Sequence, residues 1–582
     1  MKIRILVFAA VLVCAFAQLN AANYYMSPGG SDSDTGASPT HAWASLQHGR
    51  DILVAGDTLF VMGGTYSTAQ IWNGGNGGNA LHPIVIKAYG DAVATFTVGG
   101  AVESNVYFFN WYASDEHGHF VVDGESHLHP GTTRCLVFTG ACYRMYQVEP
   151  DIGHHRNGMV LRGCEFDGRA SNASGMGAYP VALAYADSFV IDNCYIHHAW
   201  HPTGPTSRGG DNSDNAQSVG ECLFIRSCEF GNITNNTFTY GDHGLVNIQA
   251  VRTSGAHSSR FIHVSGNLFD NGWGGGLYLT FNSTYCLVEN NIFAHSGVTT
   301  DYPKPGLQLG GSYNTVRKNV FYCPANQAMT INSQDELDGF YSVCNRNYIY
   351  NNTFYNSGAY SIQMYVDNDN GNRADCSAER NTIVNNIFYK TDHLIWTEGV
   401  ERFKALLRLE LYHANDAHNW VDPDVYGNYP NTTAWGHNKF WNNLFRYDSR
   451  GLAPDTMVLY TSDMHNLHGS FYTYNIATLQ ADGSGAWANS IGSDPMLYSE
   501  NPDVYGISRG WWHLQPGSQC IDAGVAVVDS NGIYVETNYP GYGWGNLRYE
   551  GSAPDIGAYE VNGENPTPPM APVLSSSPTR KR

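Results

Sequence analysis

Short apolar runs separated by tight polar turns make up most of this chain. A unit such as HVSGNLF (263–269) or CLVENNIF (286–293) is followed by a turn and by a second run such as GLYLT or GLQLG. Apolar and polar residues alternate in the second run, which is the period of a half-buried strand. Strands this short cannot bury a face alone, so the pattern predicts that they stack in parallel around one continuous core.

An Asn-x-Phe motif recurs in these units. Its members are Asn236 and Phe238, Asn267 and Phe269, Asn291 and Phe293, Asn319 and Phe321, Asn352 and Phe354, Asn386 and Phe388, and Asn443 and Phe445. The first six asparagines are 24 to 34 residues apart, a period typical of a stacked array, and the last step of 57 residues is interpreted as nearly two coils. We expect the amides to pair with one another and with backbone groups at sharp corners, while the phenylalanines stack in the core.

The composition fits many strands and few long helices. The 582 residues include 63 Gly and 38 Tyr, and only 14% are charged. Glycine, asparagine, tyrosine and threonine suit short strands joined by tight turns. The net charge of −21 argues against a nucleic-acid partner, because phosphates attract a basic surface. It is compatible with a neutral glycan, or with an acidic one bridged by cations.

The cysteines point to packing rather than to metal binding. None of the 12 cysteines forms a CxxC motif or a Cys/His set with zinc-ligand spacing, so a structural zinc is not expected. Cys164, Cys194 and Cys228 stand two residues before a large apolar residue, where later repeats carry Asn before Phe. We expect all three to be small core residues stacked at one position of the ladder.

The first 22 residues have the pattern of a secretory signal peptide. Lys2 and Arg4 precede an apolar stretch at 5–17, and small residues follow at Ala21 and Ala22. A lipid-anchor role for Cys14 is the alternative interpretation. No other stretch is long and apolar enough to cross a bilayer, so we expect a secreted or cell-surface monomer without a membrane span.

The two ends of the mature chain resemble secreted right-handed parallel β-helix proteins of the polysaccharide lyase type. At the start, WASLQHGRDIL is similar to the helix that caps the core in that group, and GDTLFV to the beginning of its first coil. At the end, WWHLQPGSQCIDAG and DIGAYE resemble its terminal segment. The resemblance implies an all-β parallel β-helix over 23–560. Within it, 391–500 is interpreted as an insertion in which VERFKALLRLELYHAND has helical spacing, and the Pro/Ser-rich 561–582 as a disordered tail or linker to a further module.

One face of the solenoid is predicted to carry polar and aromatic side chains. In GLVNIQ the alternation places Val246 and Ile248 inside and turns Asn247 and Gln249 to solvent. The same rule exposes Phe224, Arg226, Tyr278, Thr280, Gln308, Thr330, Asn332, Gln363 and Tyr365. Aromatic rings stack on sugars and amides bind hydroxyl groups, so this row is a candidate polysaccharide-binding surface. An ordinary hydrated polar face is the alternative.

A long polar loop is the second candidate feature. The segment 197–221 concentrates His197, His198, His201, Arg208, Asp211, Asp214 and Glu221, and the following coils place Asp242, His243 and Trp273 at matching positions. Carboxylate oxygens are the ligands that Ca²⁺ prefers, so Asp211, Asp214, Glu221 and Asp242 are candidate calcium ligands. Trp273 is a candidate sugar-binding residue, and a solvated loop is the alternative interpretation.

Two local motifs are similar to those of lyase families. GGDNSDN resembles the calcium loop of family 9 pectate lyases, although no lysine stands at 221–280 for that family's base. GECLFIRS resembles a strand of the chondroitinase B and alginate lyase family. The resemblance puts Glu221 at a metal-ligand position, Arg226 where a catalytic lysine stands and Gln249 where an arginine stands.

These features favour a calcium-assisted lyase acting on an extracellular uronate polysaccharide. β-Elimination needs a group that neutralises the carboxylate, a base and an acid. Arg226 and Arg252 are candidates for neutralising charge, and His243 and Lys304 for proton transfer. Glycoside hydrolysis by a carboxylate pair among Asp335, Glu336 and Asp338 is a weaker alternative. A non-catalytic adhesion or glycan-binding β-helix is the competing class.

Overall fold

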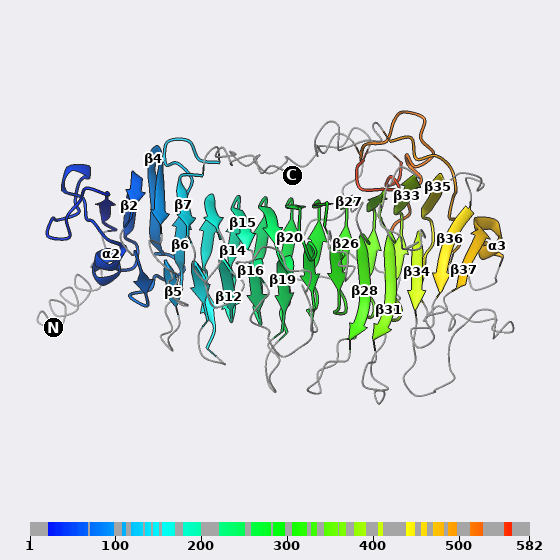
Figure 1. The fold of residues 1–582 in the computed structure, drawn as a ribbon, viewed down its shortest axis with the longest axis horizontal. Coiled ribbons are helices and arrows are strands. Elements are labelled where there is room, and N and C mark those ends of the chain that lie inside the picture. The colour runs from blue at the N-terminus through cyan, green and yellow to red at the C-terminus, as the bar shows by residue number, and fades with distance from the viewer. Residues whose placement is uncertain are drawn as a thin grey trace, which may run out of the picture.

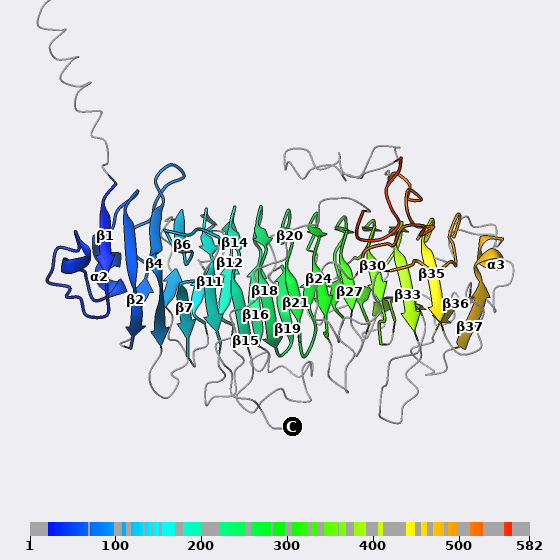
Figure 2. The same ribbon diagram turned by 90° about the horizontal axis from the view of Figure 1, so that it is seen from above.

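Stacked coils of short strands form the body of the protein (Figure 1). The computed structural model describes residues 21–67, 70–97, 108–111, 118–131, 134–140, 144–149, 154–168, 179–199, 220–250, 258–280, 283–296, 305–322, 327–334, 343–358, 360–367, 378–391, 406–410, 438–448, 456–461, 470–481, 487–497, 512–527 and 552–560. Among the described strands the pairs between coils are parallel, except that β36 and β37 pair antiparallel. Figure 2 shows the same stack from above, with β1 near one end and β37 near the other.

The larger sheet contains two strands from each typical coil. Its strands are β1 (Asn23–Met26), β2 (Thr58–Tyr66), β4 (Ile84–Thr97), β6 (Phe120–Asp123), β7 (Leu136–Thr139), β10 (Val160–Arg162), β11 (Cys164–Asp167), β14 (Val190–Asp192), β15 (Tyr195–Ala199), β17 (Asn232–Thr234), β18 (Thr237–Gly241), β20 (His263–Ser265), β21 (Leu268–Asp270), β23 (Leu287–Glu289), β24 (Ile292–Ala294), β26 (Thr315–Arg317), β27 (Val320–Tyr322), β29 (Tyr348–Tyr350), β30 (Thr353–Tyr355), β32 (Thr382–Val384), β33 (Ile387–Thr391) and β35 (Leu444–Asp448). The series from β6 to β32 is called strip 1, and the series from β7 to β35 strip 2. The long strand β4 pairs with both β6 and β7 and so joins the two strips.

The second sheet, called strip 3, takes one strand from each coil. Its strands are β3 (Trp72–Asn73), β5 (Phe109–Trp111), β8 (Tyr146–Val148), β12 (Val181–Ala184), β16 (Glu221–Arg226), β19 (Gly244–Gln249), β22 (Leu277–Leu279), β25 (Leu307–Leu309), β28 (Met329–Gln334), β31 (Ile362–Asp367), β34 (Leu407–Glu410), β36 (Thr456–Thr461) and β37 (Ser470–Asn475). A small sheet pairs β9 (Arg156–Asn157) with β13 (Ala186–Asp187), and the described helices are η1 (Pro39–His41), α2 (Leu46–Ile52) and α3 (Ile476–Gln480). The right-handed parallel β-helix expected from the sequence is confirmed.

The asparagine ladder lies at the corner between strips 1 and 2, as predicted. The Asn319 amide oxygen accepts from both the backbone N and the Nδ2 of Asn291 at 3.0 Å, and its own Nδ2 donates to the next amide, on Asn352, at 3.0 Å. The seven ladder asparagines are buried, and the phenylalanines stack beneath them with ring centroids 4.6 to 5.4 Å apart. Each amide therefore satisfies backbone groups that a corner would leave unpaired.

The final step of the ladder is a single coil, so its interpretation as nearly two coils was wrong. Asn386 Nδ2 donates to Asn443 Oδ1 at 3.1 Å, and the Phe388 and Phe445 rings stack at 4.9 Å. The intervening residues add length to one coil without adding a rung to strip 2, because β33 pairs directly with β35. Extra residues between two strands change the repeat length but not the stacking of the core.

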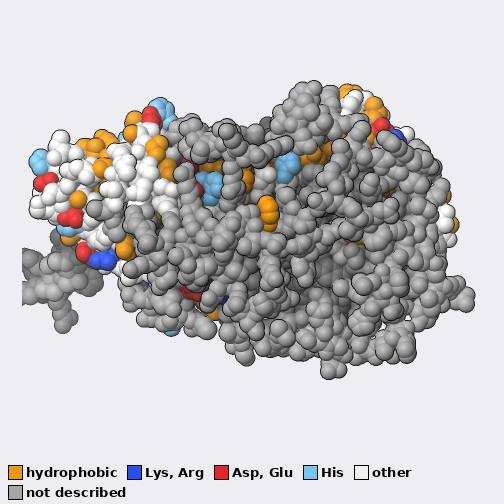
Figure 3. Space-filling view, viewed as in Figure 1, with side chains coloured by type: hydrophobic (Ala, Val, Ile, Leu, Met, Phe, Trp, Pro, Cys, Tyr) orange, Lys and Arg blue, Asp and Glu red, His pale blue; other side chains and the backbone are white. Residues whose placement is uncertain are grey.

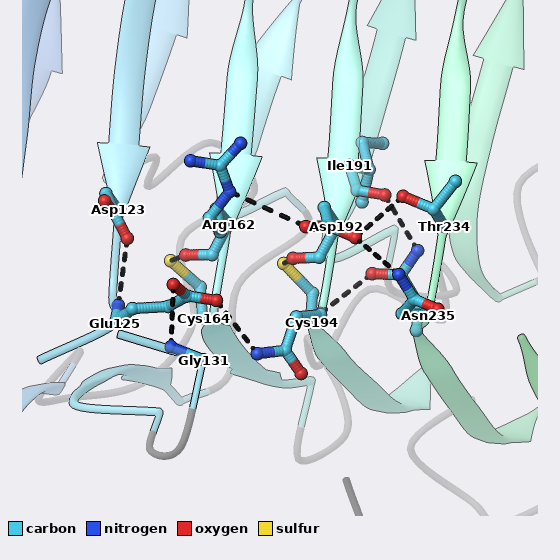
Figure 4. Close-up of polar contacts among 12 residues, drawn as sticks. Asp123, Glu125, Gly131, Arg162, Cys164, Ile191, Asp192, Cys194, Thr234 and Asn235 are labelled. Atoms are coloured by element: carbon cyan, nitrogen blue, oxygen red, sulfur yellow. Dashed lines mark hydrogen bonds and ion pairs between the residues drawn. The ribbon is translucent and has the colours of Figure 1, made fainter. Parts of the chain in front are cut away.

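The cysteines occupy two ladder positions rather than one. Cys164 and Cys194 stack at the asparagine corner, and the backbone N of Cys194 donates to the Asn236 amide oxygen at 2.8 Å. Figure 4 shows their thiols facing the carbonyl oxygens of Arg162 and Asp192, at 3.2 and 3.4 Å. Cys228 instead lies at a corner next to strip 3, where its backbone N donates to the Ser259 hydroxyl at 3.3 Å. The same sequence context recurs at two corners because each coil has more than one sharp turn.

A helix covers the first coil, and C-terminal segments pack on the side of the last coils. The expected capping helix is α2, which begins after Ser45, whose hydroxyl accepts from the His48 backbone N at 3.1 Å. Toward the other end, the described segments 512–527 and 552–560 lie against the outer side of strips 1 and 2, where the Asn385 and Asn442 amides donate to the carbonyls of Val525 and Ala523 (Figure 1). No helix within the described ranges is long and apolar enough to span a membrane.

The helical spacing assigned to VERFKALLRLELYHAND was also wrong where the structure describes it. Leu407–Glu410 form strand β34, which pairs in parallel with β31. Leu407 and Leu409 are buried and lie in register with Ile362 and Met364, which are buried core residues of the previous coil. The alternation of Leu with Arg and Glu is a strand period, and stacking on an existing core decided between the two interpretations.

Candidate functional site

The predicted polar row exists on the outer side of strip 3. Phe224, Asn247, Tyr278, Gln308, Thr330 and Gln363 are consecutive register partners on adjacent coils. Val246 and Ile248 are fully buried, as the alternation predicted. The row therefore points away from the core.

The expectation that the whole row faces solvent was wrong. Asn247, Tyr278, Thr280, Thr330, Asn332 and Gln363 are all buried, with exposed fractions between 0% and 8%. The Tyr278 hydroxyl donates to the His243 carbonyl at 3.0 Å, and the Thr280 hydroxyl to the Asn247 amide oxygen at 3.4 Å. An alternation rule does not include such contacts between coils. Phe224, Arg226, Gln249, Trp273 and Gln308 keep partial exposure.

The turn between β18 and β19 builds the centre of the candidate site. The backbone N atoms of Asp242 and His243 both donate to the Gly220 carbonyl at 3.1 Å, which holds the turn beside the start of β16. His243 Nδ1 then lies 2.9 Å from Glu221 Oε1, and the Asn247 amide donates to the same oxygen at 2.9 Å. Glu221 is 2% exposed, whereas the His243 side chain is 22% exposed. A buried carboxylate thus orients a histidine that solvent can reach.

Two carboxylates of this turn carry oxygens without partners. Glu221 Oε2 and Asp242 Oδ1 are buried and have no hydrogen-bond partner among the described residues. Burial raises the pKa of Asp242 to about 7. A buried carboxylate oxygen without a donor is costly, and a proton or a bound cation would satisfy it.

Arg226 belongs to a different cluster at the far end of β16. Its Nη2 pairs with Glu149 Oε1, while Arg144 Nη1 pairs with the other oxygen of the same carboxylate. Gln147 Nε2 also donates to Glu149 Oε2, at 2.6 Å. Two guanidinium groups therefore share one carboxylate. Sequence reasoning missed Arg144 and Glu149, because their pairing with Arg226 crosses two coils and leaves no local motif.

The two clusters are too far apart to contact one sugar ring. Arg226 is in register with Gln249, whereas His243 precedes the other end of β19. Six strand residues span roughly 20 Å at about 3.3 Å each. Arg226 and His243 therefore cannot both contact one sugar unit.

Several predicted residues lie outside the described residues. These are Arg252, Lys304, Asp211, Asp214, His201, Arg208, Asp335, Glu336 and Asp338, together with the side chain of Tyr365. His197 and His198 are at the end of strand β15 rather than in the loop where the sequence placed them. Within the described ranges, one group of three or more converging His, Cys, Asp or Glu ligands occurs, formed by Asp167, His197 and His198, and it does not include Glu221 or Asp242.

The comparisons with known proteins concern the fold. No protein-family model matches the chain, and no curated protein sequence does. The pectate lyase Pel9A is similar in structure, with 12% identity, a TM-score of 0.43, and 94% of this chain and 98% of that one covered. A family 6 polysaccharide lyase from Pseudopedobacter saltans has 13% identity, a TM-score of 0.38, and 70% and 92% coverage. The A-module of a mannuronan C-5 epimerase from Azotobacter vinelandii has 13% identity, a TM-score of 0.39, and 61% and 89% coverage.

Proposed function

We propose that this protein acts on an extracellular uronate-containing polysaccharide by β-elimination, with His243 as the base and Glu221 orienting it. The observation that carries the proposal is the 2.9 Å contact between His243 Nδ1 and the buried Glu221 carboxylate. When Nδ1–H donates to Glu221, the Nε2 lone pair remains available to accept a proton. The partial exposure of His243 leaves it open to a substrate.

The partly exposed residues along strip 3 support a role in binding an extended sugar chain. Phe224, Gln249, Trp273 and Gln308 are the partly exposed members of the predicted binding set. Their aromatic faces and amides are suited to sugar rings and hydroxyls. Asn247 and Tyr278 act indirectly, since Asn247 holds the Glu221 carboxylate and the Tyr278 hydroxyl holds the His243 backbone.

Ca²⁺ is part of the proposal as the group that offsets the uronate charge. The orphaned oxygens of Glu221 and Asp242 are of the type that a hard cation binds, and Asp211 and Asp214 remain predicted ligands. Bound Ca²⁺ would supply electrostatic stabilisation of the substrate carboxylate. Lys304 remains a predicted residue for proton transfer, and secretion remains the predicted localisation.

The test measures the ultraviolet absorbance of unsaturated uronate products. The purified protein is incubated with pectate, alginate and glycosaminoglycans, with Ca²⁺ or with chelator. We expect product from one class of uronate polymer, lost in chelator. His243→Ala should lower kcat about 10²- to 10⁴-fold with little change in KM, which is the usual contribution of a general base.

A matched control separates the site from a general effect of losing a histidine. His129 Nδ1 makes the same 2.9 Å contact with a carboxylate, that of Asp91, at an exposed position. His129→Ala should retain full activity. Binding without any product would overturn the elimination mechanism in favour of the non-catalytic glycan-binding class. If the protein neither binds nor cleaves any of the polymers, both the elimination mechanism and the glycan-binding class are rejected.

A further inference from the structure

The corner between strips 2 and 3 brings successive side chains together in a way that a strand alone cannot. Neighbouring side chains of a strand point to opposite faces. At this corner the chain turns through a left-handed residue in several coils, namely His198, Tyr240, Asn271 and His295, with φ between 48° and 59°. The corner residue can then join the side chain just before it, and Asn271 does so by donating to Asp270 at 2.9 Å.

In one pair of coils this geometry gathers three metal-ligand side chains. Asp167 ends β11, and His197 is its register partner on β15, with His198 at the corner. The Nδ1 atoms of His197 and His198 lie 3.6 and 3.4 Å from Asp167 Oδ1 and within hydrogen-bond distance of each other. One ligand atom from each residue falls within 4.8 Å of the others. Asp167 and His197 are 2% and 4% exposed, whereas the His198 side chain is 30% exposed.

A second layer of contacts orients these ligands. His197 Nε2 lies 3.3 Å from Glu165 Oε1, which favours the tautomer with a proton on Nε2 and a lone pair on Nδ1. The Thr139 hydroxyl donates to the other Asp167 oxygen at 3.4 Å. Tyr195 stacks on the His197 ring at 3.9 Å, and Tyr240 on the His198 ring at 5.0 Å. Metal-binding histidines commonly have such a carboxylate partner on their second nitrogen, and ligating carboxylates are themselves hydrogen-bonded.

We propose that Asp167, His197 and His198 bind a divalent transition metal of the zinc class. Two imidazole nitrogens and one carboxylate oxygen form a set that suits Zn²⁺, Fe²⁺, Co²⁺ or Ni²⁺, whereas Ca²⁺ requires oxygen ligands. These three ligands would fill three positions of a tetrahedral site, and His198 is the most exposed of them. The three ligands include neither Glu221 nor His243, so the proposal does not depend on the proposed lyase activity.

The same corner provides a matched control. His295 Nδ1 lies 2.9 Å from Asp270 Oδ1, so an Asp–His pair again spans two adjacent coils. Here the corner histidine, His295, follows an alanine rather than a second histidine, because Ala294 occupies the position equivalent to His197. His295→Gln removes a corner histidine from the same environment but leaves the proposed metal site complete.

The experiment titrates chelator-treated, dialysed full-length protein with Zn²⁺ by calorimetry and with Co²⁺ by visible absorption. We expect one Zn²⁺ per chain, a ligand-field Co²⁺ spectrum that Zn²⁺ abolishes and Ca²⁺ does not, and unchanged behaviour in His295→Gln. His198→Gln and Asp167→Asn should weaken Zn²⁺ binding by at least tenfold. Glu165→Gln, which removes only the outer partner, should weaken it about 10- to 100-fold.

Two outcomes would overturn the proposal. One is the absence of saturable Zn²⁺ and Co²⁺ binding by the wild-type protein, which would identify the cluster as a hydrogen-bonded network sharing a proton. The other is wild-type affinity in both His198→Gln and Asp167→Asn, which would place any bound metal elsewhere. Circular dichroism of each variant monitors folding. The wild-type Co²⁺ spectrum tests the ligand set even where a variant fails to fold.

Discussion

Glu289 illustrates how a single buried charge depends on the side chains stacked around it. The carboxylate lies 2.9 Å from His263 Nε2 and 2.7 Å from Arg317 Nε, so the three residues form a charged network across β20, β23 and β26. Burial acts to raise the pKa of Glu289, but the hydrogen bond with His263 and the charge of Arg317 together lower it to about 2. Arg317 is itself 5% exposed, so each charge compensates the desolvation of the other.

Glu289→Gln should destabilise the protein by about 3–5 kcal/mol at neutral pH, because it leaves Arg317 buried without its counter-ion. The folded pKa of Glu289 is lower than the unfolded value of about 4.5, so its stabilisation is present above that value and is lost as the pH falls toward 2. The difference between wild type and variant in urea denaturation should therefore shrink on acidification below pH 4.5.

Glu229→Gln is the matched control for this prediction. Glu229 pairs with Arg260 at 2.9 Å, but the Arg260 side chain is 44% exposed and can be hydrated when the pair is broken. The expected cost is below about 1 kcal/mol. Equal destabilisation by the two substitutions would show that burial does not determine the strength of these pairs.

At the scale of elements, the asparagine ladder makes the corner between strips 1 and 2 a continuous unit. Each amide bonds to the next coil and also to the previous one, as when Asn319 Nδ2 donates to the Val288 carbonyl at 2.9 Å. An interior ladder residue is therefore bound on both sides. The contribution of one ladder asparagine to the free energy of unfolding therefore depends on its hydrogen bonds with the two adjacent coils rather than on contacts within its own coil.

Asn319→Ala should destabilise the protein by at least about 3 kcal/mol, because it leaves several buried donors and acceptors without partners at about 1–3 kcal/mol each. The measurement is the shift in the urea midpoint. Asn235→Gly is the control, since Asn235 is an exposed corner residue with φ of 56° that glycine adopts without strain. Its expected cost is below about 1 kcal/mol, and similar costs for both variants would contradict a special role for the ladder.

The same elements show why the sequence pattern predicted which residues point into the core better than it predicted which outward residues are exposed to solvent. Alternation in GLVNIQ correctly assigned Val246 and Ile248 to the core, because inward packing repeats in each strand. It could not show that Asn247 and Tyr278 would be covered, because their partners Glu221 and His243 come from other strands or turns. Likewise, the leucines around β34 fit two periods until stacking on β31 selected the strand.

At the scale of the whole molecule, the coils form a one-dimensional stack in which each coil contacts mainly its neighbours. Such arrays can lose structure locally, because the stability of a coil is the sum of its intrinsic folding free energy and the free energy of its interfaces with the two adjacent coils. The first coils depend on α2, where Leu46 is fully buried and its backbone N donates to the Gln70 amide oxygen at 2.8 Å.

Leu46→Ala should therefore act on one end of the molecule. We expect hydrogen exchange to accelerate in peptides covering α2, β2 and β4, with protection retained in those covering β30 and β33. Replacement of a buried leucine costs about 2–5 kcal/mol, enough to be visible in the first coils. A uniform loss of protection along the chain would show that the stack unfolds as one cooperative unit instead.

The sequence by itself determined the repeated strand, the asparagine corner and the aromatic core, because each depends on residues that are close in the chain and recur at regular spacing. It also located His243 and Glu221 as candidates. Only the tertiary structure decided that these two pair, that Arg226 belongs with Arg144 and Glu149, and that Asp167 meets His197 and His198. These contacts join residues from different coils, and their partners are set by the stacking register and the turn at each corner, which local spacing does not encode.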